Sequence, residues 1–150
     1  MKAVIQKVKE SSVKIDGVVK SQINCGLLIL LGIEVNDSIE DVIWLSKKIC
    51  QLRIFNDKNG IMNFSVQDVN GDIMIISQFT LLAKTKKGNR PSYINAANPS
   101  IAIPLYNSFI ENIEFEIKKK VKTGEFGAMM EVFLINDGPV TIIIDTKNKE

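Results

Sequence analysis

Apolar and polar residues alternate in short runs at the start of the chain, and turn residues separate these runs. Residues 2–8 and 12–15 follow this pattern, which is typical of short strands with one buried face. The Asp16-Gly17 pair predicts a tight hairpin turn, and residues 18–23 predict the returning strand. Residues 27–33, LLILLGI, are continuously apolar, which indicates a strand buried on both faces.

Two segments have helical rather than strand-like spacing. Ser38 and Asp41 are spaced like a capping box that opens the first helix. Its apolar face is expected to contain Ile39, Val42, Ile43, Ile49 and Cys50. Asn98-Pro99 predicts the start of the second helix, which runs to about Ile113. Pro104 lies inside this stretch and should kink the helix or delay its start.

The remaining apolar runs predict further strands. We expect them at residues 52–55, 72–81, 115–121, 129–135 and 140–144. Gly138-Pro139 separates the last two, and because proline cannot donate to a strand ladder we expect a turn there. The pattern therefore predicts one domain over residues 1–150. Its class is α+β, with a mostly antiparallel, barrel-like β-sheet and two inserted helices.

Composition and charge limit the cellular compartment and the binding partners that we expect for this protein. The hydrophobic fraction of 45%, the charged fraction of 24% and the net charge of +2 are ordinary for a globular protein. The longest apolar run, Leu27–Leu31, is too short to span a bilayer, and charges interrupt the N-terminal segment where a signal peptide would be apolar. We therefore expect a cytoplasmic protein without a membrane partner. In that compartment Cys25 and Cys50 are expected to be buried thiols.

The chain contains no histidine. This absence excludes Ser-His-Asp and Cys-His catalysis and every histidine-ligated metal site. The two separated cysteines cannot complete a thiolate zinc site either. An enzyme with this composition must use carboxylates, Lys, Tyr, the backbone or the substrate itself for proton transfer.

Two stretches carry candidate chemistry. In the predicted strand ISQFTL, Ser77 and Phe79 should face one side, and Gln78 and Thr80 the other. From the residues alone, the commoner interpretation is a strand end whose hydroxyls satisfy backbone groups. Lys84, Lys86, Lys87 and Arg90, called the basic loop below, could bind phosphate. A solvated surface loop is the usual alternative, and it applies equally to the second basic run at residues 118–122.

Four motifs together resemble the D-aminoacyl-tRNA deacylase family, also called D-tyrosyl-tRNA deacylase. They are ISQFTL, KKGNRPSY, TGEFGAMMEV and NDGPVT, in this order, and the N-terminal MKAVIQKVKESSVKIDG and GLLILLGI are similar too. The resemblance covers nearly the whole chain. It implies hydrolysis of the ester of D-aminoacyl-tRNA without a cofactor or metal. It also implies a homodimer with two sites at its interface, and aminoacyl-tRNA rather than DNA as the partner.

The same resemblance assigns site residues. Ser77, Gln78, Phe79 and Thr80 would line the catalytic pocket for the 3′-terminal aminoacyl-adenosine. Gly138-Pro139 matches a Gly-cis-Pro motif that reaches into the partner's pocket and rejects L-aminoacyl groups. The remaining substrate-binding positions are Phe126 and Met130, which would hold the adenine, and Ala102, a pocket wall.

The role of Thr80 has two interpretations, as a nucleophile or as a bystander to a substrate 2′-hydroxyl. We favour the second, because no base is evident in the motif to activate a threonine hydroxyl. A noncatalytic RNA-binding module is the main alternative function, and a dimer without a ligand is a third. The weak net charge and the lack of interleaved aromatic and basic residues argue against the RNA-binding module.

Overall fold

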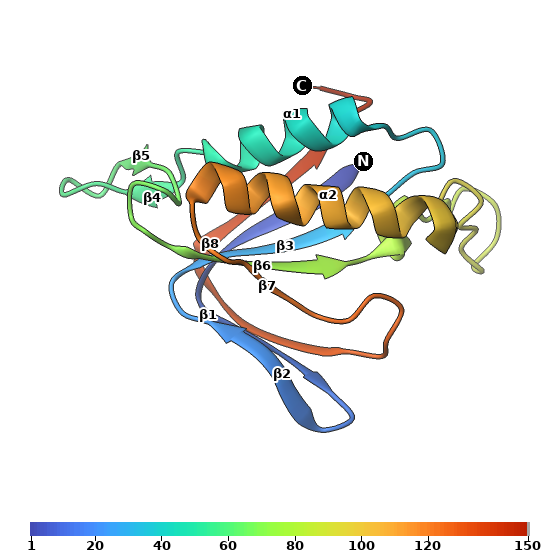
Figure 1. Ribbon diagram of the computed structural model, residues 1–150, viewed down its shortest axis with the longest axis horizontal. Coiled ribbons are helices and arrows are strands. Elements are labelled where there is room, and N and C mark those ends of the chain that lie inside the picture. Colours follow the sequence, from blue (N-terminus) through green and yellow to red (C-terminus); the bar gives the residue numbers. More distant parts are fainter. Residues whose placement is uncertain (150) are drawn as a thin grey trace.

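The computed structural model describes residues 1–149 and consists of a curved sheet with two helices packed across one face (Figure 1). The helices are α1 (Ile39–Cys50) and α2 (Pro99–Ile117), and a short 3-10 helix, η1 (Phe79–Leu82), follows β6. The strands are β1 (Lys2–Ile15), β2 (Val18–Ile23), β3 (Gly26–Gly32), β4 (Phe55–Asn56), β5 (Met62–Phe64), β6 (Asp72–Ser77), β7 (Lys122–Thr123) and β8 (Glu131–Asp145).

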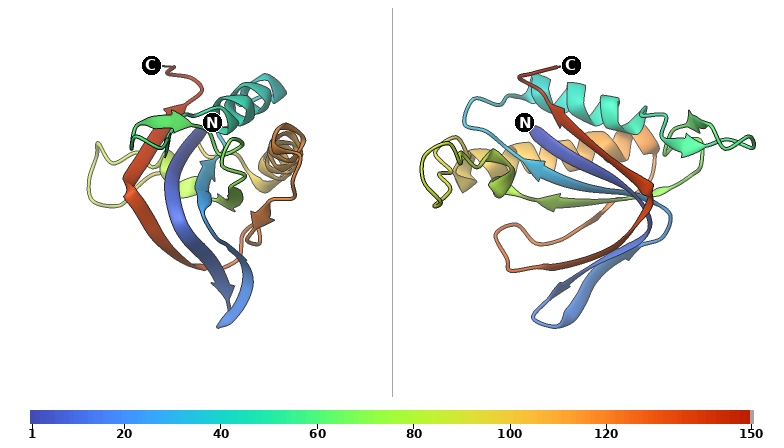
Figure 2. Two further views of the ribbon diagram at one scale, coloured as in Figure 1. Left: turned by 90° about the vertical axis from the view of Figure 1, so that its left-hand side faces the viewer. Right: turned by 180° about the vertical axis from the view of Figure 1, so that it is seen from behind.

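The long strand β1 organises the main sheet. It pairs antiparallel with β2 and β3 on one side and with β8 on the other, while β3, β6 and β7 are parallel neighbours. The sheet curls strongly, so that β2 and the start of β8 swing away from the helices (Figure 2). The predicted α+β class, with a mostly antiparallel, barrel-like sheet and two helices, is confirmed.

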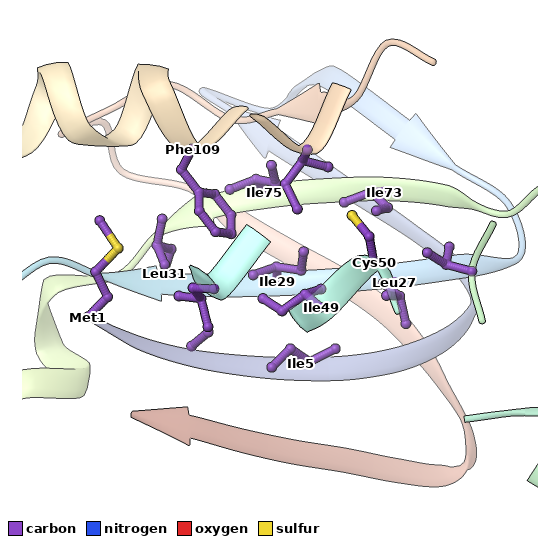
Figure 3. Close-up of a cluster of buried hydrophobic side chains, with 14 of the residues drawn as sticks. Met1, Ile5, Leu27, Ile29, Leu31, Ile49, Cys50, Ile73, Ile75 and Phe109 are labelled. Carbon is purple, nitrogen blue, oxygen red and sulfur yellow. The ribbon is translucent and has the colours of Figure 1, made fainter. Parts of the chain in front are cut away.

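Two apolar clusters lie on opposite faces of the sheet. The larger cluster fills the space between sheet and helices, where Phe109 of α2 packs beside Ile75, Ile29 and Ile49 (Figure 3). The smaller cluster lies inside the curl and includes Leu28, Met74 and Ile76. Strands β3 and β6 therefore bury side chains on both faces, as the continuous run at residues 27–33 predicts.

Several predicted strand boundaries were wrong. Residues 2–8 and 12–15 belong to one strand, because β8 pairs along almost the whole length of β1. The strand predicted at residues 115–121 does not form, since α2 continues to Ile117 and ends at Lys118 in the left-handed region (φ 52). Pro104 does not delay the start of α2 either, because Asn98 accepts the N–H of Ile101 and fixes the first turn.

The start of α1 is as predicted, whereas its buried face differs. The N–H of Ser38 donates to the Asp41 carboxylate at 2.9 Å, as in a capping box. The buried face consists of Val42, Leu45, Ser46, Ile49 and Cys50, and Ile39 and Ile43 are exposed instead. Of the two cysteines expected to be buried, Cys50 is buried and Cys25 is exposed.

The start of β1 and the end of β8 are joined by a polar cluster beside α1. The Met1 ammonium donates to Asp37 and to the hydroxyl of Thr146, and Lys147 pairs with Asp37 and Asp41. The side chains of Met1 and Asp37 are fully buried. Neither helix in the described part of the chain is long and apolar enough to cross a membrane.

Candidate active site

A cavity of about 310 Å³ opens where β6 leaves the sheet. Figure 1 shows that the end of β6, the yellow loop after it and the start of α2 lie at the same end of the molecule. The lining comes from these elements, from the end of β3 and from the segment before β8. It consists of Leu31, Ile33, Ile76, Ser77, Gln78, Phe79, Ala97, Ala102, Phe126, Gly127, Ala128, Met129, Met130 and Val132.

The floor of the cavity is a turn, not the strand predicted at residues 72–81. Strand β6 ends at Ser77, and the N–H of Gln78 donates the last bond to the carbonyl of Leu31 at 2.7 Å. The chain then turns into η1, which packs closely against Gly32. A Cβ on Gly32 would lie only 3.1 Å from the carbonyl oxygen of Gln78, so a larger residue there would crowd the turn.

The turn changes the directions of the candidate catalytic side chains. Ser77, Gln78 and Phe79 line the cavity, whereas Thr80 is exposed outside its lining. The side-chain amide of Gln78 donates to the hydroxyl of Thr80. Within residues 1–149 neither Ser77 nor Thr80 uses its hydroxyl to bond a backbone group. The interpretation that these hydroxyls satisfy backbone groups is therefore not supported.

Two backbone donors in the turn after Gln78 have no partner among the described residues. The N–H of Leu81 donates to the carbonyl of Gln78 at 3.3 Å, but no acceptor within the described residues bonds the N–H of Phe79 or Thr80. The first N–H groups of a helical turn have no partner within that turn. The turn therefore contains two adjacent N–H groups that no acceptor among the described residues satisfies.

The opposite wall is apolar and rests on the core. The ring of Phe126 packs edge-to-face on Tyr106, with the ring centroids 5.7 Å apart. The Tyr106 hydroxyl donates to the carbonyl of Ile75 at 2.8 Å, and burial raises the pKa of this phenol, so it remains a donor. Met130 lies over Gly124, where a Cβ would overlap its sulfur atom. Ala102, from the first turn of α2, closes the wall.

Gly138-Pro139 lies outside this cavity. The peptide bond between the two residues is cis, as expected, and both residues are exposed. The prediction that a turn separates two strands was wrong in detail, because the whole segment belongs to β8. In the pairing with β1, Gln6 is opposite Thr141 and Val8 is opposite Asn136, so residues 137–140 of β8 bulge out opposite the single residue Lys7. A bulge tolerates the proline, which needs no ladder bond.

Side chains from both strands hold the bulge. The Asn136 side chain accepts the N–H of Val140 at 3.2 Å and donates to the hydroxyl of Thr141 at 3.0 Å. The Lys7 ammonium lies 3.3 Å from the Asp137 carboxylate, and the Lys7 side chain is only 7% exposed. The sequence analysis missed both Lys7 and Asn136. Lys7 follows Ala3 and Ile5 at every second position of the same strand, so the alternation could have predicted that its side chain points inward.

The cavity thus brings together only some of the predicted site residues. Those that line it are Ser77, Gln78, Phe79, Ala102, Phe126 and Met130; those that do not are Thr80, Gly138 and Pro139. No group of three or more Cys, Asp or Glu residues that could hold a metal ion occurs within residues 1–149. The groups that the cavity offers a ligand are therefore hydroxyl, amide, backbone N–H and apolar surfaces.

The basic loop lies next to this site and is exposed. Its base is closed by two backbone bonds between Lys84 and Ser92, of 2.8 and 3.0 Å. No carboxylate in the described part of the chain forms an ion pair with Lys86, Lys87 or Arg90. The second basic run differs, because Asp72 pairs with Lys119 and Glu114 with Lys120.

Comparison with known proteins identifies the family. The sequence model of the D-Tyr-tRNA(Tyr) deacylase family matches residues 4–145. The chain belongs to this family. It is 64% identical to the D-aminoacyl-tRNA deacylase of Flavobacterium psychrophilum and 61% identical to that of Bacteroides fragilis, over the full length of each chain. The predicted family, and with it the prediction of an enzyme of the hydrolase class, is confirmed.

Solved structures agree on the fold of this deacylase-family chain. One, titled "c-Myc DNA Unwinding Element Binding Protein", is 39% identical and has a TM-score of 0.90, with 97% of this chain and 98% of that chain covered. Another, titled "Structural Analysis of a probable eukaryotic D-amino acid tRNA deacylase", has a TM-score of 0.82 and covers 95% of this chain and 97% of that chain. At 15% identity, the second shows the shared fold alone.

Proposed function

We propose that this protein hydrolyses the ester bond between a D-amino acid and the 3′ end of tRNA, releasing both. The observation that carries the proposal is the cavity at the end of β6, which combines unbonded N–H donors with an apolar wall in a chain of the deacylase family. Such an ester is already reactive. The site needs to bind it, admit water and stabilise the negative charge that develops on the carbonyl oxygen.

The free N–H groups of Phe79 and Thr80 suit that last task. Both belong to the backbone of a packed turn, so they need little rearrangement to meet an oxyanion. One donor placed in this way contributes roughly 2.7–4 kcal/mol to stabilisation of the transition state. This mechanism needs no histidine, which agrees with the composition.

The attacking group is water, and the substrate's own 2′-hydroxyl assists it. Thr80 does not act as the nucleophile in this proposal. The side-chain partner of its hydroxyl is the Gln78 amide, which donates a hydrogen bond and cannot accept a proton from it. A threonine hydroxyl without a base is too weakly acidic to be activated at neutral pH.

Phe126 and Met130 would hold the adenine of the terminal nucleotide, and Ala102 would form the pocket wall beside them. Phe126 is fixed by Tyr106, and Met130 by Gly124, so both side chains are positioned before the substrate binds. A preformed wall reduces the ordering that binding requires. The packing supports a binding surface for a base, but apolar contact alone does not select adenine over another base.

A second copy of the chain would complete the site with its Gly138-Pro139 bulge. The bulge is exposed and lies outside the lining of its own cavity. The exposed apolar residues Phe133, Ile135 and Met129, nearby in sequence, suit a subunit interface. Rigid main-chain atoms placed where an L side chain must go reject it by clash. Many D-amino acids would then be accepted, and so would glycine, which has no side chain to reject.

The deciding experiment compares hydrolysis of D-Tyr-tRNA, L-Tyr-tRNA and Gly-tRNA by the purified protein of known oligomeric state. We expect a dimer that deacylates the D-tyrosyl and glycyl substrates and spares the L-tyrosyl one. Binding of all three without hydrolysis would support the noncatalytic RNA-binding alternative. Equal hydrolysis of D- and L-Tyr-tRNA would exclude the chiral filter.

A matched pair of variants tests the position of the filter. Gly138 and Gly60 both have positive φ, 127° and 77°, so alanine is strained at either position. Gly138→Ala should reduce the preference for D- over L-Tyr-tRNA, whereas Gly60→Ala, in the hairpin of β4 and β5, should leave that preference unchanged. An equal effect of both variants would mean that only general stability was affected.

A further inference from the structure

An aromatic pair stands on the rim of the cavity, on the side of the basic loop. The rings of Phe79 and Tyr93 meet edge-to-face, with centroids 5.0 Å apart and planes at 72°. Phe79 lines the cavity and is 56% exposed; Tyr93 is 37% exposed and lies outside the lining. The two rings therefore extend the aromatic surface from the cavity toward solvent.

The backbone around Tyr93 is anchored on both sides. The preceding residue, Ser92, makes the two bonds with Lys84 that close the basic loop. After Tyr93, the carbonyl of Asn95 accepts the N–H of Val35 at 3.1 Å, and the N–H of Ala97 donates to Ile33 at 2.9 Å. Tyr93 does not belong to either apolar core cluster. The Tyr93 ring is therefore exposed while its backbone is held in place, so little backbone ordering would be needed for the ring to contact a ligand.

Unpaired positive charge lies at the end of the same loop. Lys86, Lys87 and Arg90 lie within the loop that Ser92 closes, and they form no ion pair within the described residues. The sequence lacks an alternation of aromatic and basic residues, but the fold creates one by bringing Phe79 of η1 against Tyr93. Aromatic rings beside unpaired cations are the usual combination for binding single-stranded nucleic acid.

We propose that Phe79 and Tyr93 form a stacking platform for the nucleotide that precedes the terminal adenosine of the substrate, and that the basic loop contacts its phosphates. The inference rests on the proposed function, which places the terminal adenosine in the cavity. The preceding nucleotide must then leave across the rim, where Phe79 passes from the cavity to Tyr93. Stacking does not read sequence, so the platform serves any tRNA.

The test uses two substrates that differ only in what precedes the terminal adenosine. D-tyrosyl-tRNA contains the preceding nucleotides, and D-tyrosyl-adenosine lacks them. Tyr93→Ala should raise KM for D-tyrosyl-tRNA roughly 5- to 150-fold, the range that stacking of one base provides, with kcat little changed. The same variant should treat D-tyrosyl-adenosine as the wild type does. Tyr93→Phe keeps the ring and should behave like the wild type on both substrates.

Phe115→Ala is the matched control, because Phe115 is an exposed aromatic residue of α2 that does not line the cavity. It should change neither KM. If Tyr93→Ala alters both substrates equally, the ring supports the cavity itself, and the platform is wrong. If it alters neither, the preceding nucleotide does not contact Tyr93, and the platform is equally wrong.

A binding measurement separates this inference from the proposed function. Uncharged tRNA with 2-aminopurine in place of the penultimate base should lose fluorescence on binding the wild type and Tyr93→Phe, because stacking quenches the base. Quenching should be much weaker with Tyr93→Ala at saturating protein. Equal quenching by the wild type and Tyr93→Ala, or none by the wild type, would overturn the platform even if no substrate is hydrolysed. Lack of hydrolysis with normal quenching would overturn the proposed function alone.

Discussion

The ion pair of Lys7 and Asp137 joins β1 to the bulge that carries Gly138-Pro139, and its two halves should contribute unequally to stability. The Lys7 side chain is 7% exposed, whereas that of Asp137 is 35% exposed. Removing the carboxylate leaves a cation almost without water, while removing the cation leaves a carboxylate that water still reaches. We therefore predict that Asp137→Asn destabilises the protein more than Lys7→Met does.

The distance between the two charges sets the expected loss of stability. At 3.3 Å and an effective dielectric constant of 20, the attraction between the two charges is about 5 kcal/mol before any loss of hydration is subtracted. Breaking a buried pair from one side costs about 3–5 kcal/mol, and we expect Asp137→Asn to approach this range. Lys7→Met should cost about 1–2 kcal/mol, because the remaining carboxylate stays partly hydrated and methionine preserves the packing of the lysine stem.

Urea unfolding of the wild type, both single variants and the double variant measures these values. All four should be compared at one protein concentration, because the proposed dimer would make stability concentration-dependent. The double variant contains no stranded charge, so its loss should be smaller than the sum of the single losses by roughly 2–3 kcal/mol. Lys2→Met is a matched control on the same strand pair. It removes a more exposed pair with Asp145, at 3.6 Å, and should cost less than about 1 kcal/mol.

Two results would refute this reasoning. If Asp137→Asn is no worse than Lys7→Met, burial of the lysine does not govern the asymmetry. If Lys7→Met equals Lys2→Met, the pair behaves like a surface pair and does not hold the bulge. The proposed function adds a second measurement, since loosening the bulge should lower the ratio of D-Tyr-tRNA to L-Tyr-tRNA hydrolysis, and Lys2→Met should leave that ratio intact.

Three further predictions follow from the site and its surroundings. Thr80→Ala should keep the single-turnover rate on D-Tyr-tRNA within about tenfold, whereas a loss of about four decades or a trapped acyl-enzyme would make Thr80 the nucleophile. Replacing the four cations of the basic loop by alanine should weaken tRNA binding and reduce its salt slope by roughly 2–3, and an unchanged slope would move the contact elsewhere. Desolvation alone would raise the pKa of Asp41, but hydrogen bonds from Lys147, Thr146 and Ser38 lower it below its ordinary value of 3.8. The ionised Asp41 carboxylate therefore stabilises the fold above pH 3.8, and this stabilisation is lost progressively as the pH falls further. Wild type and Asp41→Asn should differ in unfolding free energy at neutral pH, and the difference should shrink below about pH 4.

The position of Thr80 illustrates what the sequence could not supply. Residues 73–76 form an apolar run, and apolar residues recur at Phe79 and Leu81, so the pattern predicts a single strand that continues past Ser77. The strand ends at Ser77 because the neighbouring β3 ends at Gly32, and Leu31 provides the last partner for β6. Beyond Gln78 the segment has no backbone partner on β3, and the length of β3 is set by other contacts. The motif identified the right segment, but the directions of its side chains required the fold.

The end of α2 shows the opposite case, in which the sequence contained a signal that we weighed wrongly. Phe115, Glu116 and Ile117 alternate, which suggested a strand. Ile113 and Ile117 are also four residues apart, and both pack in the core in the structure. The four-residue spacing predicted the structure correctly. In the helix Phe115 points away from the core and is exposed. Short alternating runs cannot distinguish these cases without knowledge of the packing partner.

In the proposed site, backbone atoms perform the steps that usually need side chains. N–H groups of Phe79 and Thr80 meet the developing charge, and the Gly138-Pro139 backbone of a second subunit excludes the L side chain. A substitution changes a side chain but leaves these atoms in the chain, so it acts on the reaction only by moving them. The residues that fix the backbone, Gly32 beside the turn and Lys7 beneath the bulge, should therefore affect selectivity more than the hydroxyl of Thr80 does. In such a site, substitutions that disturb the packing should reduce activity more than substitutions of polar side chains. The reverse holds in a histidine-based hydrolase.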